Sequence, residues 1–265
     1  MAFEKKEKAP FTLASPMTRR LSRMAETEEG ASLASYTGVL WKCLFFLGIT
    51  FLGVALSLLL NTVGSFIAED VPVTAAAVLG AVVSLICMIV FPFIASFFPR
   101  TSPVTGSIGC ASIGFVLAFA AVAVEEYSGI VFMALLLTLG IVLSMAFVYF
   151  FAKIRITNRA YRVFTAILIA YLISGLLIGL CYFLPPFRAM YLLFATNPVI
   201  MILSGIFGVA IAAVMLMFDF ESVRSTVENR LPKTCEWAAA YSLIFTVLWL
   251  YIEVLNLLRI LNDKK

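Results

Sequence analysis

The chain of 265 residues contains no histidine, and only 13% of its residues are charged. Histidine is the commonest transition-metal ligand and the commonest general base, so its absence argues against haem, zinc and Ser-His chemistry. The five cysteines lie singly without CxxC spacing, which is typical of small buried hydrophobic side chains. The acids also lack the glycine motif of membrane aspartyl proteases. We therefore expect no enzyme, no catalytic residue and no cofactor.

Apolar residues, by contrast, are abundant, at 63% of the chain against about 45–50% in soluble proteins. They form continuous runs rather than the alternating pattern of barrel strands, and each run is long enough to cross a bilayer as a helix. The expected fold is an all-α membrane protein, a single bundle of seven transmembrane helices. The runs lie at 39–60, 73–95, 104–124, 129–151, 163–184, 199–218 and 238–260.

The chain divides into two parts. Residues 1–36 are polar, basic and rich in Ser, Thr and Pro, and such a segment cannot bury a core, so we expect a disordered cytoplasmic tail. Residues 37–265 form the seven-helix transmembrane domain.

Prolines are expected at helix boundaries, with Pro92 near the end of the second helix and Pro198 at the start of the sixth. Past Phe220, alternating charges at helical spacing predict that the sixth helix continues until Leu231-Pro232.

Two acids inside the last apolar hairpin stand out. Asp219 ends the sixth apolar run and Glu253 lies within the seventh, where an ionisable side chain costs roughly 2.5–3.5 kcal/mol and usually faces the bundle interior. On the last helix, helical spacing places one polar stripe on an otherwise apolar surface, and we expect that stripe to face other helices. Its members are Ser242, Thr246, Glu253 and Asn256.

Ordered motifs in several of these helices resemble the bacterial Bax inhibitor-1 (YccA-like) family. In the first half they are Ser102-Pro103, Glu125-Glu126-Tyr127-Ser128-Gly129-Ile130-Val131 with Thr138, and Ile154-Arg155-Ile156-Thr157. In the closing hairpin they are Phe218-Asp219-Phe220-Glu221, Pro232-Lys233, Glu236-Trp237 and Trp249-Leu250-Tyr251-Ile252-Glu253-Val254-Leu255. The resemblance extends from about residue 37 to the end of the sequence.

This resemblance implies a pH-sensitive leak for cations, of which calcium is the best known. In the family, a pair of acids on the sixth and seventh helices shares a proton and latches the pore. Asp219 and Glu253 fit those positions, so we predict that they gate the pore, sense pH and bind Ca²⁺ transiently. The seventh-helix acid here is a glutamate.

The two acids are 34 residues apart in the sequence. Taking the hairpin tip near Leu231-Pro232, Asp219 lies about 12 residues before it and Glu253 about 21 after it. In straight, parallel helices the two acids would therefore differ in depth by about 14 Å, at ~1.5 Å per residue. Helix tilt would reduce that offset. Otherwise the partners of the two acids are other polar residues of the hairpin, for which the candidates are Glu221, Glu236 and Asn256.

The alternative function is a non-conducting membrane regulator that binds a membrane protease or another membrane partner. The expected environment is a lipid bilayer, the inner membrane of a bacterial cell, which the chain crosses several times. Nucleic-acid binding has no support beyond a net charge of +4, which the distribution of basic residues across the membrane explains.

Lysine and arginine are distributed very unevenly between the two faces of this bundle. With the N-terminus inside, fourteen of them fall on the inner face and four on the outer face, while Lys42 near the start of the first helix can snorkel inward. The acidic turns containing Glu69-Asp70 and Glu125-Glu126 then lie outside, solvated or concentrating cations near the pore.

We therefore predict that the N-terminus is inside and the C-terminus outside. A reporter domain that is active only in the cytoplasm, fused after Lys265, should be silent, while the same reporter fused before Met1 should be active. Cytoplasmic activity of the C-terminal fusion would refute this topology.

Overall fold

The computed structural model describes residues 33–67, 74–122, 128–151 and 158–262. Within these ranges the chain forms seven long helices of 21 to 32 residues and no β-strand. They are α2 (Tyr36–Ile67), α3 (Thr74–Phe97), α4 (Ser102–Val122), α5 (Ser128–Phe151), α6 (Asn158–Phe183), α8 (Pro198–Glu228) and α9 (Cys235–Asn262). Each predicted apolar run coincides with one long helix, which confirms the all-α fold expected from the sequence.

Five helical segments in the described part of the chain are long and apolar enough to cross a membrane: Tyr36–Leu60, Pro99–Phe119, Gly129–Phe151, Pro198–Glu228 and Cys235–Asn262. α3 and α6 contain shorter apolar stretches, Leu79–Ala95 and Arg162–Ile178. Large apolar side chains project outward from this bundle, among them Phe51 and Phe151, which are 71% and 73% exposed. A surface of this kind is stable in lipid rather than in water, so the chain is a multi-pass membrane protein.

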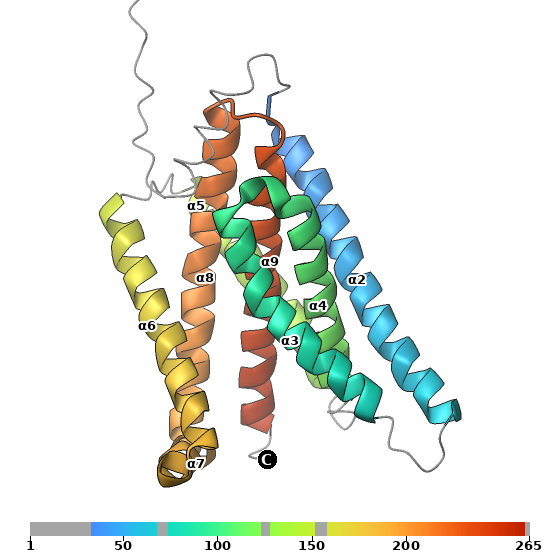
Figure 1. Ribbon diagram of the computed structural model, residues 1–265. Coiled ribbons are helices and arrows are strands. Elements are labelled where there is room, and N and C mark those ends of the chain that lie inside the picture. Colours follow the sequence, from blue (N-terminus) through green and yellow to red (C-terminus); the bar gives the residue numbers. More distant parts are fainter. Residues whose placement is uncertain (1–32, 68–73, 123–127, 152–157, 263–265) are drawn as a thin grey trace, which may run out of the picture.

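Helix α9 occupies the centre of the bundle (Figure 1). It packs against α2, α4, α5 and α8, and both clusters of buried apolar side chains include its residues. One cluster joins α9 to α2 and α4 through Tyr241, Phe46 and Ile113, and the other joins it to α5 and α8. α6 and the short α7 (Arg188–Thr196) lie at one edge, beside α8 (Figure 1). The last hairpin is therefore the part of the chain around which the other helices assemble.

Three boundaries differ from the sequence prediction. Pro92 lies inside α3, which continues to Phe97, because neighbouring groups in a membrane bundle can satisfy the backbone that a proline frees. The turn η3 (Pro185–Phe187) leads into α7, a helix that the apolar runs did not predict. The described chain begins with Leu33–Ser35 ordered ahead of α2, whereas the predicted tail extended to residue 36. Residues 1–32 lie outside the described ranges.

Helix α8 follows the prediction closely. Pro198 is its first residue, and Asn197 caps it by accepting hydrogen bonds from the backbone N–H groups of Val199 (3.0 Å) and Ile200 (3.4 Å). The helix then runs without interruption to Glu228, ten residues past the end of its apolar run. This confirms the extension that the alternating charges predicted.

Two glycines allow α2 and α4 to touch through their backbones. A Cβ atom at Gly53 would overlap the carbonyl oxygen of Ala111, and one at Gly114 would overlap the carbonyl oxygen of Thr50. Without a hydrophobic effect between helices in lipid, such close approach is a main source of association. The α2–α4 pair is therefore a fixed frame on which α9 packs.

We predict that Gly53→Ala and Gly114→Ala destabilise the protein, because the added methyl group must push the two backbones apart, at about 1–3 kcal/mol each. Thermal unfolding in detergent micelles measures the effect. Gly48→Ala is the matched control on the same helix α2: a Cβ atom there would have no neighbouring atom within 4 Å, so the midpoint should not fall. Equal midpoints for all three variants would contradict the close-packed frame.

Candidate functional site

The α8–α9 turn determines which side chains of the hairpin meet. Arg230 adopts a positive φ of 51°, and the turn is closed by hydrogen bonds from the Leu231 N–H to the Thr226 carbonyl (3.1 Å) and from the Cys235 N–H to the Pro232 carbonyl (2.9 Å). The two helices then run antiparallel with a definite register. In that register, Asp219 of α8 lies opposite Ser242 of α9.

Asp219 is buried, with 4% of its surface exposed. Its Oδ1 accepts a hydrogen bond from the Ser242 hydroxyl, while its Oδ2 has no hydrogen-bond partner within the described residues. Thr246, one turn farther along α9 and fully buried, lies beside the same carboxyl, but its hydroxyl is not in hydrogen-bonding geometry with any group of the described residues. We call Asp219, Ser242 and Thr246 the Asp219 site.

The Asp219 site contains one acid and no base. Asp219 makes no ion pair in the part of the chain that the structure describes. Burying a carboxylate without a counter-charge costs several kcal/mol, so such a group stays buried only when it holds a proton or a cation. The site can therefore bind one or the other.

Glu253 lies in a different environment, between α6, α8 and α9. The indole N–H of Trp249 donates to its Oε1 at 3.0 Å, and the hydroxyl of Tyr171 on α6 donates to the same oxygen at 3.4 Å. Its other oxygen lies against Gly208 of α8, where a Cβ atom would be 2.5 Å from Oε2. Glu253 thus connects three helices, and a glycine makes room for it.

The structure does not bring Asp219 and Glu253 together. Glu253 is 11 residues beyond Ser242 on α9, and Gly208 is 11 residues before Asp219 on α8, which puts the two acids about 16 Å apart along the helices. Helix tilt does not close the offset estimated from the sequence, because the turn fixes the register. The prediction that Asp219 and Glu253 share a proton is therefore corrected: the two acids occupy separate carboxyl sites.

The other candidate partners also lie elsewhere. Glu221 accepts a hydrogen bond from the Tyr149 hydroxyl of α5 at 2.6 Å, Glu236 pairs with Lys42, and Asn256 is exposed, contrary to the expectation that the whole polar stripe faces helices. Within the described residues, no three His, Cys, Asp or Glu side chains gather as a metal site. A calcium site holding both Asp219 and Glu253 is therefore not formed. Glu125 and Glu126 lie outside the described residues.

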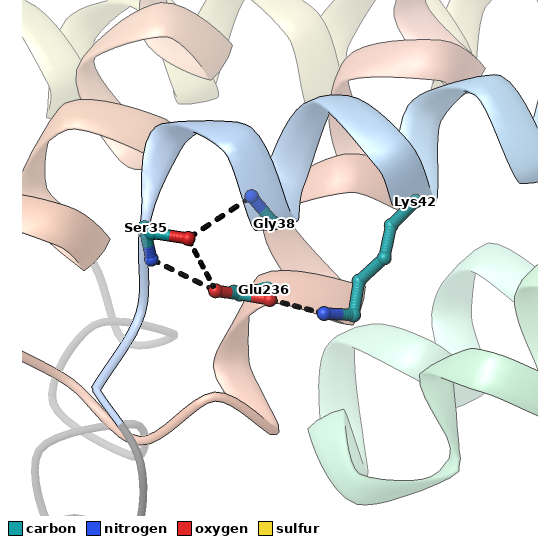
Figure 2. A network of polar contacts seen from close by, with 4 residues as sticks. All are labelled: Ser35, Gly38, Lys42 and Glu236. Atoms are coloured by element: carbon teal, nitrogen blue, oxygen red, sulfur yellow. Dashed lines mark hydrogen bonds and ion pairs between the residues drawn. The ribbon is translucent and has the colours of Figure 1, made fainter.

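A second polar network, in which Lys42 and Glu236 are buried, joins the start of α2 to the start of α9 (Figure 2). Glu236 is completely buried. One of its oxygens accepts a hydrogen bond from the Ser35 N–H at 2.8 Å, and the other pairs with the Lys42 ammonium. The Ser35 hydroxyl accepts from the Gly38 N–H at 3.0 Å, which caps α2. We call Ser35, Gly38, Lys42 and Glu236 the α2–α9 clasp.

The clasp corrects the expectation that Lys42 snorkels to the membrane surface. Its side chain is 10% exposed, and its ammonium lies 5.1 Å from the centre of the Trp237 ring, a cation–π distance. The backbone adds to the connection, because the Ala34 N–H donates to the Leu231 carbonyl at 2.9 Å. The sequence offered no signal for this pair, since 194 residues separate its members.

The chain matches the family described as Bax inhibitor 1 like over residues 13–263, nearly its whole length. No curated protein and no solved structure matches it at a significant level. A match of this extent shows that the chain belongs to the Bax inhibitor-1-like family, as its motifs indicated.

We predict that breaking the clasp destabilises the fold. Lys42→Met or Glu236→Gln leaves one buried charge without its partner, which costs about 3–5 kcal/mol, whereas the double variant removes both charges and should cost less than either single one. The midpoint of thermal unfolding in detergent measures these effects. Glu228→Gln removes the exposed ion pair with Arg224 and should cost at most about 1 kcal/mol. Single variants as stable as wild type would disprove the buried pairing.

Proposed function

We propose that this member of the Bax inhibitor-1-like family is a pH-sensitive leak for cations, calcium among them, and that Asp219 is its principal gating group. The observation that supports this is the state of the Asp219 carboxyl. It is buried between two membrane helices, and among the described residues it accepts one hydroxyl hydrogen bond while its second oxygen has no partner. A group in that state responds to pH because its burial depends on a bound proton or cation.

Proton loss at Asp219 offers a physical route from pH to helix movement. The protonated acid is neutral and fits the contact between α8 and α9. The ionised form needs water or a cation beside it, and either of these requires the two helices to separate. Because α9 packs against α2, α4, α5 and α8, a shift at this contact reaches most of the bundle. Flux should therefore rise as pH rises through the titration of Asp219.

Glu253 remains a predicted gating residue, but its contribution should be independent of Asp219. Carboxyl groups about 16 Å apart cannot share a proton through a hydrogen bond, so each of them binds and releases its own proton. Its hydrogen bonds to Trp249 and Tyr171 connect α9 to α6. Loss of Glu253 should then alter flux through the position of α6 rather than through the Asp219 contact.

We predict that Asp219→Asn flattens the dependence of calcium flux on pH between about 6 and 8, a range in which buried carboxyl groups exchange their proton. Asparagine keeps the shape and the hydrogen-bonding capacity of the side chain but cannot titrate. The measurement is calcium entry into proteoliposomes that contain a calcium-sensitive dye, with protein folding checked by gel filtration.

The matched control is Glu228→Gln, on the same helix α8 but 54% exposed at its side chain, which should keep the wild-type pH profile. Glu253→Gln should change flux, and its effect should add to that of Asp219→Asn in the double variant. A wild-type profile in folded Asp219→Asn would remove Asp219 from the gate. Absence of flux from wild-type vesicles would instead favour the non-conducting regulator.

A further inference from the structure

The Asp219 site combines three oxygen-bearing side chains with very little internal hydrogen bonding. Asp219 is 4% exposed and Thr246 is fully buried. Apart from the bond between Ser242 and Oδ1, neither Oδ2 of Asp219 nor the Thr246 hydroxyl has a partner in the described part of the chain. Buried polar atoms without partners are uncommon, and each one calls for a bound ligand or water.

The geometry points to a binding site for one small monovalent cation of the sodium class, which occupies the Asp219 site in exchange for a single proton. This inference rests on the proposed function and deepens it, because it names the ion class that the gate itself holds. The ligands are the carboxylate of Asp219 and the hydroxyls of Ser242 and Thr246. All are hard oxygen donors, which suit alkali and alkaline-earth cations rather than soft metals.

Charge decides between these two classes of hard cation. One carboxylate neutralises one positive charge, so a monovalent ion leaves the buried site neutral, as a proton does. A calcium ion would leave one positive charge uncompensated in this buried site.

Among the described residues, no second acid is placed to balance a divalent ion at this site. On α8 itself, Glu221 is bound by Tyr149 of α5, and Glu228 is paired with Arg224. On α9, Glu236 is paired with Lys42 of α2, and Glu253 is about 16 Å along the helix. The polar side chains of α9 beside the Asp219 carboxyl are Ser242, which donates a hydrogen bond to it, and Thr246, and neither carries a charge.

Ion-dependent unfolding of the full-length protein in detergent tests the inference without any flux. At pH 8, NaCl should raise the midpoint of thermal unfolding by about 3–6 °C at ten times the dissociation constant, relative to choline chloride of equal ionic strength. In the pH range where the sodium-free site is protonated, the apparent sodium affinity should fall about tenfold for each unit of pH decrease, because one proton is exchanged for one cation.

Variants assign the effect to the site. Asp219→Asn should abolish the sodium-dependent shift, and Ser242→Ala and Thr246→Val should weaken sodium binding about fivefold or more, while Glu228→Gln keeps it. Ser242→Asp adds a second carboxyl opposite Asp219 and should transfer the preference from sodium to calcium. Ser242→Asp should gain stabilisation by calcium, which a variant that merely fails to fold cannot show. It therefore separates a change in the site from a general loss of folding.

Equal midpoints in NaCl and choline chloride, or a sodium shift that survives in Asp219→Asn, would overturn the inference. Stronger stabilisation of the wild type by CaCl₂ than by NaCl, through Asp219, would overturn the monovalent assignment. These failures are distinct from failure of the proposed leak: a pH-dependent calcium flux that requires Asp219 can coexist with absent sodium binding, and sodium binding can be measured in a protein that does not conduct.

Discussion

A carboxyl group buried among membrane helices must be neutralised or hydrogen-bonded, and the central helix α9 meets this requirement in three different ways. Near its start, Glu236 is paired with the ammonium of Lys42. Farther along, Glu253 accepts hydrogen bonds from Trp249 and Tyr171. Between them, Ser242 and Thr246 offer Asp219 of α8 only hydroxyl groups, which carry no charge. The three environments distinguish an acid in an ion pair, an acid that connects helices and an acid with one oxygen that is not hydrogen-bonded among the described residues.

The bundle around these acids is packed unevenly. The α2–α4 pair is held by backbone contact at Gly53 and Gly114, and more than half of the apolar window within Pro99–Phe119, a segment that includes most of α4, is buried. α6, by contrast, contacts the hairpin through a few aromatic pairs, such as Phe164 with Phe218 and Tyr171 with Phe207, and through the Tyr171–Glu253 hydrogen bond. Helices that move at the α8–α9 contact would thus have the closely packed α2–α4 pair on one side and α6, which makes few contacts with the hairpin, on the other.

Much of the fold was predictable because it depends on local properties of the chain. Continuous apolar runs longer than a strand predict helices, and alternating charges after Phe220 predicted that α8 extends past its apolar run, although it ends at Glu228 rather than at Leu231-Pro232. The exceptions have different causes. Pro92 continues a helix because a membrane bundle tolerates an interior proline, and α7 is too short and too polar at its start to register as an apolar run.

The sequence by itself determined that the chain is a membrane protein of seven long helices and that Asp219 and Glu253 are unusual among the apolar residues around them. It also placed Ser242 and Thr246 on one stripe of the last helix. Only the tertiary structure decided that Asp219 meets Ser242 rather than Glu253, and that Lys42 meets Glu236. Periodicity along one helix defines which residues share a face, but contact with a second helix depends on axial register and rotation. The α8–α9 turn and the packing of α2 against α9 set those two quantities, and no linear pattern encodes them.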